Sequence, residues 1–319
     1  QKLVDSTGYE EISLSSLSSG DYSCLSSLCE GLMERFSDKR VSISLPSLRI
    51  DSVVKDSLAQ TQKVKKSSLT FAPEAGTQRL RDVINKGVTE EDLLEKLRDA
   101  FEGGWNSVKL YFMLGLPTET QADLEGIAKL AQEAVRAYYA VPKDKRAKGL
   151  RVTCSASVFV PKPFTPFQWC AQDPMDVVKQ KQSDLRKMFG AARGATFHWH
   201  DPSISYLEAC FAVGDRKLAD VLFRAWELGC KLDGWNDQFR YDLWMQAFAD
   251  CGVDSAFYAN RPRGLEELLP WDFIDIGVTK RYLRLEYERA LRGQTTRDCR
   301  LGCNGCGIER TKGLCALCE

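Results

Sequence analysis

The feature that most constrains this chain is the alternation of residue types within its strands. The first half of the sequence alternates short strand candidates with amphipathic helices, which is typical of a parallel sheet with right-handed crossovers. Parallel strands buried on both faces are usually continuous apolar runs. Here apolar residues alternate instead with Ser, Thr, Lys and Tyr. The strand candidates are residues 10–17, 41–49, 67–72, 107–114 and 151–160.

One face of each predicted strand is therefore apolar, and the other is small and polar. In residues 107–114, Val108, Leu110 and Phe112 lie on the first face, and Lys109 and Tyr111 on the second. The apolar face has to meet the helices, so the polar face has to line another space. In a closed barrel that space is the lumen, and a polar lumen suits a polar ligand. The alternative is an open sheet with one solvated face, which is uncommon for parallel strands. The pattern favours a barrel.

The helical periodicity predicts the remaining elements and a division into three parts. Apolar residues at i, i+3 and i+4 predict helices over residues 22–36, 90–101 and 121–139. Thr89 and Asp92 form a near capping box at the start of the second helix. After residue 169 we expect no further strand. We expect one helix that begins at Asp173-Pro174 and ends at about residue 189, and further helices over 204–212, 216–228, 238–250 and 280–292. The predicted division is a partial barrel over 1–169, a mostly helical extension over 170–297 and a cysteine-rich tail over 298–319.

Composition narrows the function classes. Lys+Arg and Asp+Glu are both 44, so the net charge is zero, and no basic footprint indicates a nucleic-acid partner. No apolar run approaches the ~20 residues of a membrane span, and the first residues do not form a signal peptide. We therefore expect a cytoplasmic protein with no membrane partner. Because the chain begins at Gln1 without an initiator Met, we expect it to be a piece of a longer protein.

Loops that follow the predicted strands are where sites form in parallel α/β folds. They include the segments SSGD at 18–21, FAPEAGTQRLR at 71–81, GLPTET at 115–120 and VPKPFTPF at 160–167. This set resembles the radical S-adenosylmethionine (radical SAM) superfamily, and most closely an uncharacterised bacterial family with a cobalamin-binding type domain upstream of the barrel. Nearly the whole chain is covered, including the segments WHDP at 199–202, LGCK at 228–231 and LPWD at 269–272. The implied fold is a partial (β/α)6-type, TIM-like barrel.

The resemblance implies cofactor contacts residue by residue. The loop at 18–21 matches the position that meets the methionine amino group of the cofactor. Arg49 matches a position near the ribose or the carboxylate. Gly115-Leu116-Pro117 matches the loop that lies against the adenine. Arginine at 81 suits the methionine carboxylate because its fork matches that group. Lys109 and Tyr111 are implied substrate-facing residues with a catalytic role. The full set of expected cofactor contacts is Ser18, Ser19, Gly20, Asp21, Arg49, Glu74, Gly76, Arg81, Gly115, Leu116, Pro117, Val160 and Pro161.

Each of these residues also has a purely structural interpretation. Gly115 and Pro117 are common turn residues. Glu74 could pair with Arg81, or Lys109 could neutralise Glu74. His198 and His200 share one face at i, i+2 spacing; two histidines can bind metal or act as acid and base, although hydrogen-bonded histidines are more frequent.

The twelve cysteines fall into two groups. Seven are scattered among apolar residues, as small buried hydrophobes are. Five lie in the tail and are predicted metal ligands: Cys299, Cys303, Cys306, Cys315 and Cys318. Their spacing allows a zinc site of two knuckles, a second iron–sulfur cluster, or no metal. Cys299, Cys303 and Cys306 also have the C-x3-C-x2-C spacing of the radical SAM cluster motif, which a permuted barrel would use. The resemblance instead places the three cluster cysteines before Gln1.

The function that the resemblance implies is that of a radical SAM enzyme. A 4Fe-4S cluster and S-adenosylmethionine would generate a 5′-deoxyadenosyl radical that modifies an unknown substrate in the lumen. The implied reductant is flavodoxin or ferredoxin. If the upstream domain binds cobalamin, methyl transfer is one implied outcome. The chain on its own is expected to be inactive. One alternative is a non-catalytic barrel scaffold with a zinc-stabilised docking tail. Another is a barrel hydrolase or aldolase, for which Lys109 is the Schiff-base candidate.

Overall fold

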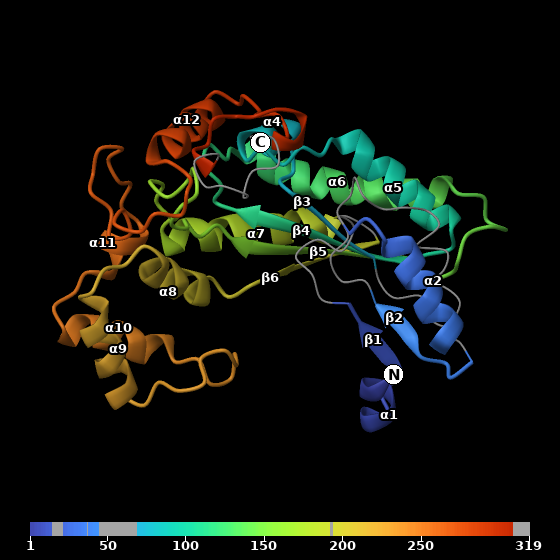
Figure 1. Ribbon diagram of the computed structural model, residues 1–319, viewed down its shortest axis with the longest axis horizontal. Coiled ribbons are helices and arrows are strands. Elements are labelled where there is room, and N and C mark those ends of the chain that lie inside the picture. Colours follow the sequence, from blue (N-terminus) through green and yellow to red (C-terminus); the bar gives the residue numbers. More distant parts are fainter. Residues whose placement is uncertain (15–21, 37, 45–68, 192–193, 309–319) are drawn as a thin grey trace.

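Two parallel sheets form the centre of the fold (Figure 1). The computed structural model describes residues 1–14, 22–36, 38–44, 69–191 and 194–308. The larger sheet has the order β3-β4-β5-β6, and β1 pairs with β2 in the smaller one. The strands are β1 (Glu11–Ser13), β2 (Ser42–Ser44), β3 (Leu69–Glu74), β4 (Ser107–Leu114), β5 (Arg151–Val158) and β6 (Ala195–Trp199). This mixed α/β fold with parallel sheets confirms the predicted fold class, a partial TIM-like barrel followed by a helical region.

The helices connect these strands and make up most of the second half of the chain. They are α1 (Lys2–Thr7), α2 (Leu25–Phe36), α4 (Gln78–Val83), α5 (Glu90–Glu102), α6 (Gln121–Ala140), α7 (Met175–Ala191), α8 (Pro202–Ala212), α9 (Leu218–Glu227), α10 (Tyr241–Asp250), α11 (Ser255–Ala259), α12 (Lys280–Leu291) and the 3-10 turn Cys299–Leu301. The starts of α5 and α6 are fixed by capping boxes, at Thr89 with Asp92 and at Thr120 with Asp123.

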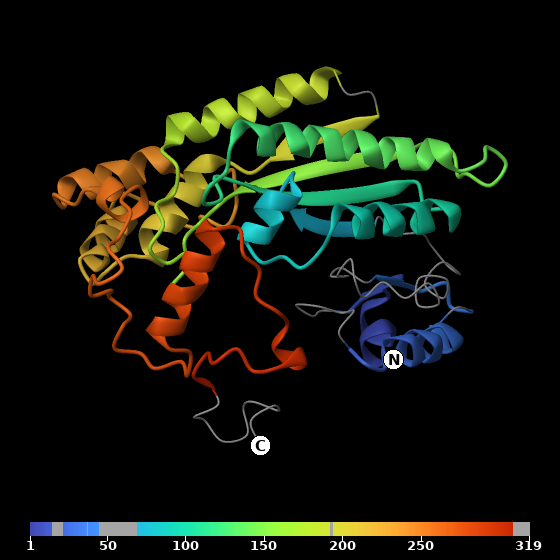
Figure 2. The ribbon, with the colours of Figure 1, turned by 90° about the horizontal axis from the view of Figure 1, so that it is seen from above.

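The predicted two-faced strands are present in the larger sheet. Buried and half-buried residues alternate along all of β3 and β4. Val108, Leu110 and Phe112 lie at 0 to 1% exposure in one core with residues of α5, α6 and α7. Figure 2 shows these three helices along the sheet, with the N-terminal segment set apart from them. The polar face of the sheet is therefore turned away from the helical layer.

The strand β6 corrects the expectation that no strand follows residue 169. It pairs with β5 in parallel, from Val152 opposite Ala195 to Ala156 opposite Trp199. The sequence pattern missed it because β6 is a short edge strand in which Ala195 alone is buried. An edge strand with exposed Thr and His side chains has too little apolar alternation to be recognised. The sheet thus continues past the predicted barrel boundary at residue 169.

The N-terminal strands are shorter than predicted within the described residues. In the pairing of β1 with β2, Ile12 lies opposite Ile43, whose side chain is buried against α2 together with Val41. The hydroxyl of Ser42 donates to the carbonyl of Glu10 over 3.1 Å. The predicted continuations of these strands, residues 15–17 and 45–49, lie outside the described residues.

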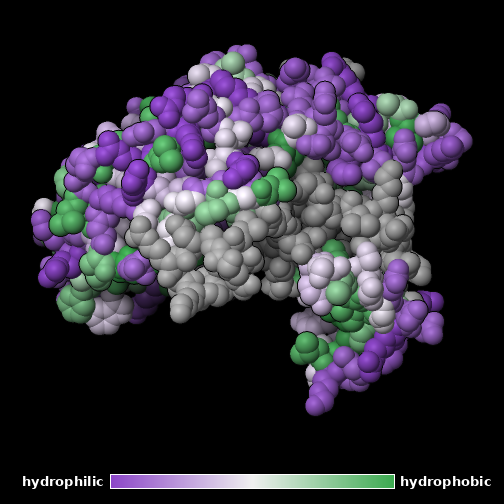
Figure 3. Space-filling view, turned by 45° about the horizontal axis from the view of Figure 1, so that its top comes forward, coloured by the Kyte–Doolittle hydropathy of each residue, from purple (hydrophilic) through white to green (hydrophobic). Residues whose placement is uncertain are grey.

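The second half of the chain is mainly helical, as expected. Helices α8 to α11 enclose their own core, in which Cys210, Val221, Ala225 and Ala247 have no exposed surface. In the space-filling view of Figure 3, hydrophilic side chains dominate the outer face of α5 and α6, whose apolar sides cover the sheet. No helix among the described residues is long and apolar enough to cross a membrane.

Candidate functional site

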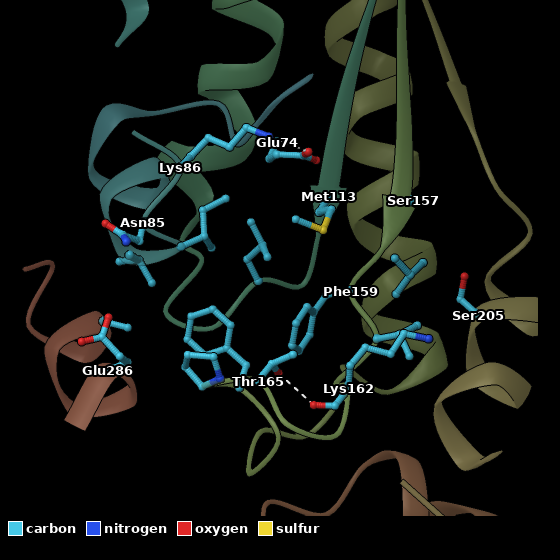
Figure 4. Close-up of a pocket in the computed structure, with 18 of the residues that line it drawn as sticks. Glu74, Asn85, Lys86, Met113, Ser157, Phe159, Lys162, Thr165, Ser205 and Glu286 are labelled. Carbon is cyan, nitrogen blue, oxygen red and sulfur yellow. Dashed lines mark hydrogen bonds and ion pairs between the residues drawn. The ribbon is translucent and has the colours of Figure 1, made fainter. Parts of the chain in front are cut away.

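A pocket of about 620 Å³ lies at the carboxyl ends of β3, β4 and β5 (Figure 4). Glu74 ends β3, Met113 and Leu116 follow from β4, and Ser157 to Val160 come from the end of β5. In parallel α/β folds, ligands bind at this edge of the sheet. The volume is in the range of pockets for small molecules and cofactors. Three of the expected cofactor contacts, Glu74, Leu116 and Val160, are brought together here.

Two ion pairs stand at the edge of this pocket. The carboxylate of Glu74 accepts from the ammonium of Lys86 over 3.0 Å, and Lys162 pairs with Glu208 on α8. Between them, the wall is apolar and includes Met113, Leu116 and Phe159. Such a pocket, mostly apolar with a few charged groups, can hold an amphipathic ligand in one orientation.

Neither of the ion pairs considered as structural alternatives for Glu74 forms. Its partner is Lys86 rather than Arg81 or Lys109, because Glu74 has the left-handed backbone angle φ of 66° and follows an irregularity in the pairing of β3 with β4. A non-glycine residue at positive φ is strained and is often found at a functional site. The irregularity also shifts the register of β3 against β4 between Phe71 and Glu74.

The 115–120 loop is fixed by a buried carboxylate. Gly115 has φ 80° and donates its backbone N–H to both oxygens of Glu119, at 3.0 and 3.1 Å. The Glu119 side chain is 3% exposed, and Lys181 of α7 donates to it and to Asp173, each over 2.6 Å. Burial raises the pKa of Glu119, against the effect of Lys181 and the Gly115 amide. Burial lowers the pKa of Lys181, but the two carboxylates outweigh it and raise that pKa.

Gly76 and Arg81 occupy structural positions beside the pocket. A Cβ at Gly76 would lie 2.2 Å from the carbonyl oxygen of Asp123, because the loop packs directly on α6. The Arg81 side chain is 1% exposed and donates to the carbonyl of Ala75 over 2.9 Å, with Glu90 at 3.8 Å. Neither residue is among those that line the pocket. The buried position lowers the pKa of Arg81, with Glu90 acting in the opposite sense.

Lys109 and Tyr111 lie on the polar face of β4, as predicted. Both are half-buried, and the Lys109 ammonium lies 4.8 Å from the centre of the Tyr111 ring. Ser155 of β5 and His198 of β6 follow Tyr111 in register. His200 lines the pocket, so the two histidines extend the same polar face of the sheet.

The other expected contacts are placed as follows. Pro117 is half-buried beside Gly115 and Leu116, and Pro161 is buried next to Val160. Ser18, Ser19, Gly20, Asp21 and Arg49 lie outside the described residues, so their roles stay predictions.

The cysteines divide between a buried set and the tail. Cys29, Cys154, Cys170, Cys210 and Cys230 are buried, as expected, whereas Cys24 is exposed and Cys251 intermediate. Burial raises the pKa of Cys154, Cys170 and Cys210 to about 12, as is typical of structural thiols in an apolar core.

In the tail, Cys299 and Cys303 are exposed, and the backbone N–H of Gly305 donates to the Cys303 sulfur over 3.3 Å. The carbonyl of Cys306 accepts from the backbone of Thr279, at the start of α12, over 2.9 Å. Within the described residues, no three Cys, His, Asp or Glu side chains are grouped for a metal ion. Cys315 and Cys318 lie outside those residues.

Comparison with known proteins relates part of this chain to a known family. Residues 2–131 match the radical SAM superfamily. An uncharacterized protein of the archaeon Methanocaldococcus jannaschii is 32% identical over 212 residues, which is 66% of this chain and 43% of that protein. The chain therefore spans less than half the length of this relative. The matched segment includes the pocket residues from Glu74 to Leu116, and the lining residues from Ser157 onward follow it.

Proposed function

We propose that this protein is a radical SAM enzyme that binds S-adenosylmethionine in the pocket at the carboxyl ends of β3 to β5. The observation that carries the proposal is the convergence of Glu74, Leu116 and Val160, from three separate loops, on one cavity of about 620 Å³. The match of residues 2–131 to the radical SAM superfamily supports an enzyme of this general class.

The residues of the pocket fit the cofactor in kind. Leu116, Phe159 and Val160 offer apolar surface for a purine ring, and Glu74 and Lys86 offer a carboxylate and an ammonium for polar groups. The backbone at Gly115, held by Glu119, presents a fixed edge beside that surface. In this assignment the chain's own residues bind and orient the cofactor and exclude water.

The chemistry supplied by S-adenosylmethionine beside a reduced 4Fe-4S cluster is reductive cleavage to methionine and a 5′-deoxyadenosyl radical, which abstracts hydrogen from substrate. A cluster needs soft thiolate ligands. In keeping with the resemblance to the radical SAM superfamily, we propose that its three cysteine ligands lie in a segment before Gln1. The tail is proposed as a separate zinc or iron–sulfur site that includes Cys315 and Cys318. Cobalamin, if an upstream domain binds it, would extend the chemistry to methyl transfer.

The experiment is performed on the full-length protein, purified anaerobically, beside residues 1–319. Iron, acid-labile sulfide, zinc and cobalt are measured in both samples. Binding of S-adenosylmethionine to each sample is measured by equilibrium dialysis. We expect about four more irons, with sulfide, in the full-length protein. Equal iron and sulfide in the two samples would assign the cluster to the tail and contradict the proposed location. Zinc alone, with no cofactor bound, would favour a non-catalytic scaffold with a zinc-stabilised docking tail.

A variant pair locates the cofactor. Ser157→Trp places an indole in the pocket, and Ser183→Trp makes the same change on the exposed side of α7. We expect the first to weaken cofactor binding at least about tenfold, corresponding to the loss of about 1.4 kcal/mol of contacts, and the second to leave it unchanged. Equal binding by both variants would place the cofactor elsewhere.

A further inference from the structure

A row of polar side chains crosses the larger sheet at Lys109. On β4, Lys109 lies in register between Thr70 of β3 and Thr153 of β5, and Thr196 of β6 follows Thr153. Neighbouring strands are about 4.8 Å apart, so in-register side chains on one face are adjacent. The hydroxyls of Thr196 and Thr153 are 3.5 Å apart, which confirms that the row is continuous. The backbone position of Lys109 thus has a threonine in register on either side.

Lys109 is a cation without a carboxylate partner among the described residues. Glu74, which was considered as a partner for Lys109, pairs instead with Lys86. The contact that Lys109 makes is with the face of the Tyr111 ring, at 4.8 Å. A half-buried ammonium loses part of its hydration, and a ring face replaces it only in part. The position is therefore electrostatically incomplete and attracts an anion.

The polar face connects this row to the pocket. The next row holds Tyr111, Ser155 and His198, and the row after it holds Met113 and Ser157, which line the pocket. Lys109 and Met113 are four positions apart along β4, or roughly 13 Å at the rise of a parallel strand. A substrate of moderate length could therefore have one end at the pocket and the other at Lys109.

We propose that Lys109, with Thr70 and Thr153, binds a compact anionic group of the substrate, a carboxylate or a phosphate monoester. The proposal rests on the proposed function, which places the reacting end of the substrate at the pocket. Lysine contributes a point charge, and threonine hydroxyls donate to the same oxygens. A Schiff-base lysine is instead activated by an apolar pocket or a neighbouring cation. The hydroxyl-lined row favours anion binding.

The test measures how anions protect Lys109 from acetylation in the full-length protein. Samples are treated with a water-soluble acetylating reagent at increasing inorganic phosphate, or increasing acetate, and the modification of each lysine is read by mass spectrometry. We expect saturating anion to slow the acetylation of Lys109 at least about tenfold, since a hydrogen bond to a charged group contributes on that scale. Lys129, exposed on α6, is the internal control and should react at a constant rate.

The two anions distinguish the two candidate groups of the substrate. Protection by phosphate alone indicates a phosphate ester, whereas protection by acetate indicates a carboxylate. The variant Thr153→Val keeps the shape of the side chain and should raise the anion concentration for half-protection severalfold. A rate at Lys109 that neither anion changes would overturn the proposal. Reductive trapping of Lys109 by borohydride with a carbonyl compound, without anion protection, would overturn it in favour of the Schiff base.

Binding of S-adenosylmethionine is measured in the same samples. Anion protection without cofactor binding would contradict the proposed function and leave the anion site intact. Cofactor binding without anion protection would contradict the anion site alone.

Discussion

The carboxylate of Glu119 holds the backbone nitrogen of Gly115 through both of its oxygens, at 3.0 and 3.1 Å. Lys181 neutralises that carboxylate from α7, far along the chain, and bonds Asp173 as well. The loop against the predicted adenine position is therefore fixed from outside the pocket. Glu119 and Lys181 are positioning residues that touch no ligand in this account.

Replacement of Lys181 is expected to destabilise the protein. Lys181→Met leaves the carboxylate of Glu119, 3% exposed, without its cation. Loss of one partner of a buried pair costs on the order of 3 kcal/mol. Denaturant unfolding measures this, with Lys179→Met on the exposed side of α7 as the matched control. A free energy of unfolding within 0.5 kcal/mol of wild type, which is the usual range of surface substitutions, would show that the network does not fix the loop.

Replacement of Gly115 should have an effect that another glycine lacks. A Cβ at Gly115 would lie 2.9 Å from the Asp173 carboxylate, at a φ of 80°. Gly115→Ala should therefore cost about 1 to 2 kcal/mol of stability. Gly31, on α2, has open space around its Cα, so Gly31→Ala should be neutral or stabilising. Thermal unfolding of both variants compares them, and equal melting temperatures would contradict this account.

Glu74→Gly should separate stability from binding. The variant removes the strain of a non-glycine residue at φ 66° and also the ion pair with Lys86. These effects are about 1 kcal/mol each and oppose one another. We expect a melting temperature near that of wild type, together with weaker binding of S-adenosylmethionine in dialysis. Unchanged affinity would remove Glu74 from the cofactor site.

Acid should weaken the fold partly through Glu267. Two hydrogen bonds from Arg261, at 2.7 and 2.9 Å, together with the Gly264 amide, lower the pKa of Glu267 to about 2 against the smaller effect of burial. Because the folded-state pKa lies below the ordinary value of 4.5, this stabilisation is fully present above pH 4.5. It is lost as the pH falls toward 2.

Unfolding experiments between pH 6 and pH 2 test this titration. Glu267→Gln should be less stable than wild type near neutral pH, and its stability should fall less steeply in acid. Glu95→Gln, at an exposed position of α5, should follow the wild-type curve. A Glu267→Gln curve parallel to wild type would contradict the assignment.

Local sequence patterns predicted the elements in which burial and periodicity agree. The strand over residues 107–114 was predicted with its exact bounds, because Val108, Leu110 and Phe112 alternate with polar residues throughout. The pairing of Thr89 with Asp92 was visible at a spacing of three residues, and it forms a complete capping box. These signals are local, and nothing elsewhere in the chain overrides them.

The site depended on contacts that no local pattern contains. Lys181 reaches Glu119 across 62 positions of sequence, so nothing in either segment indicates their pairing. Neither structural alternative considered for Glu74, a pair with Arg81 or with Lys109, is present, because Glu74 lies at a positive φ beside a β-bulge and pairs with Lys86. The sequence showed an acidic residue at the end of a strand. The direction of its side chain depends on a backbone angle that the fold sets, so its partner could not be predicted.

The measurement that tests the central claim most directly is the formation of 5′-deoxyadenosine. The full-length protein is reconstituted with iron and sulfide, reduced with dithionite and incubated with S-adenosylmethionine, and the product is quantified by chromatography. The account predicts 5′-deoxyadenosine and methionine in equal amounts, and at least about tenfold less of both with Ser157→Trp, in line with the loss expected for cofactor binding. A protein that holds its cluster and cleaves no S-adenosylmethionine, or cleaves it equally well with Ser157→Trp, would contradict the account.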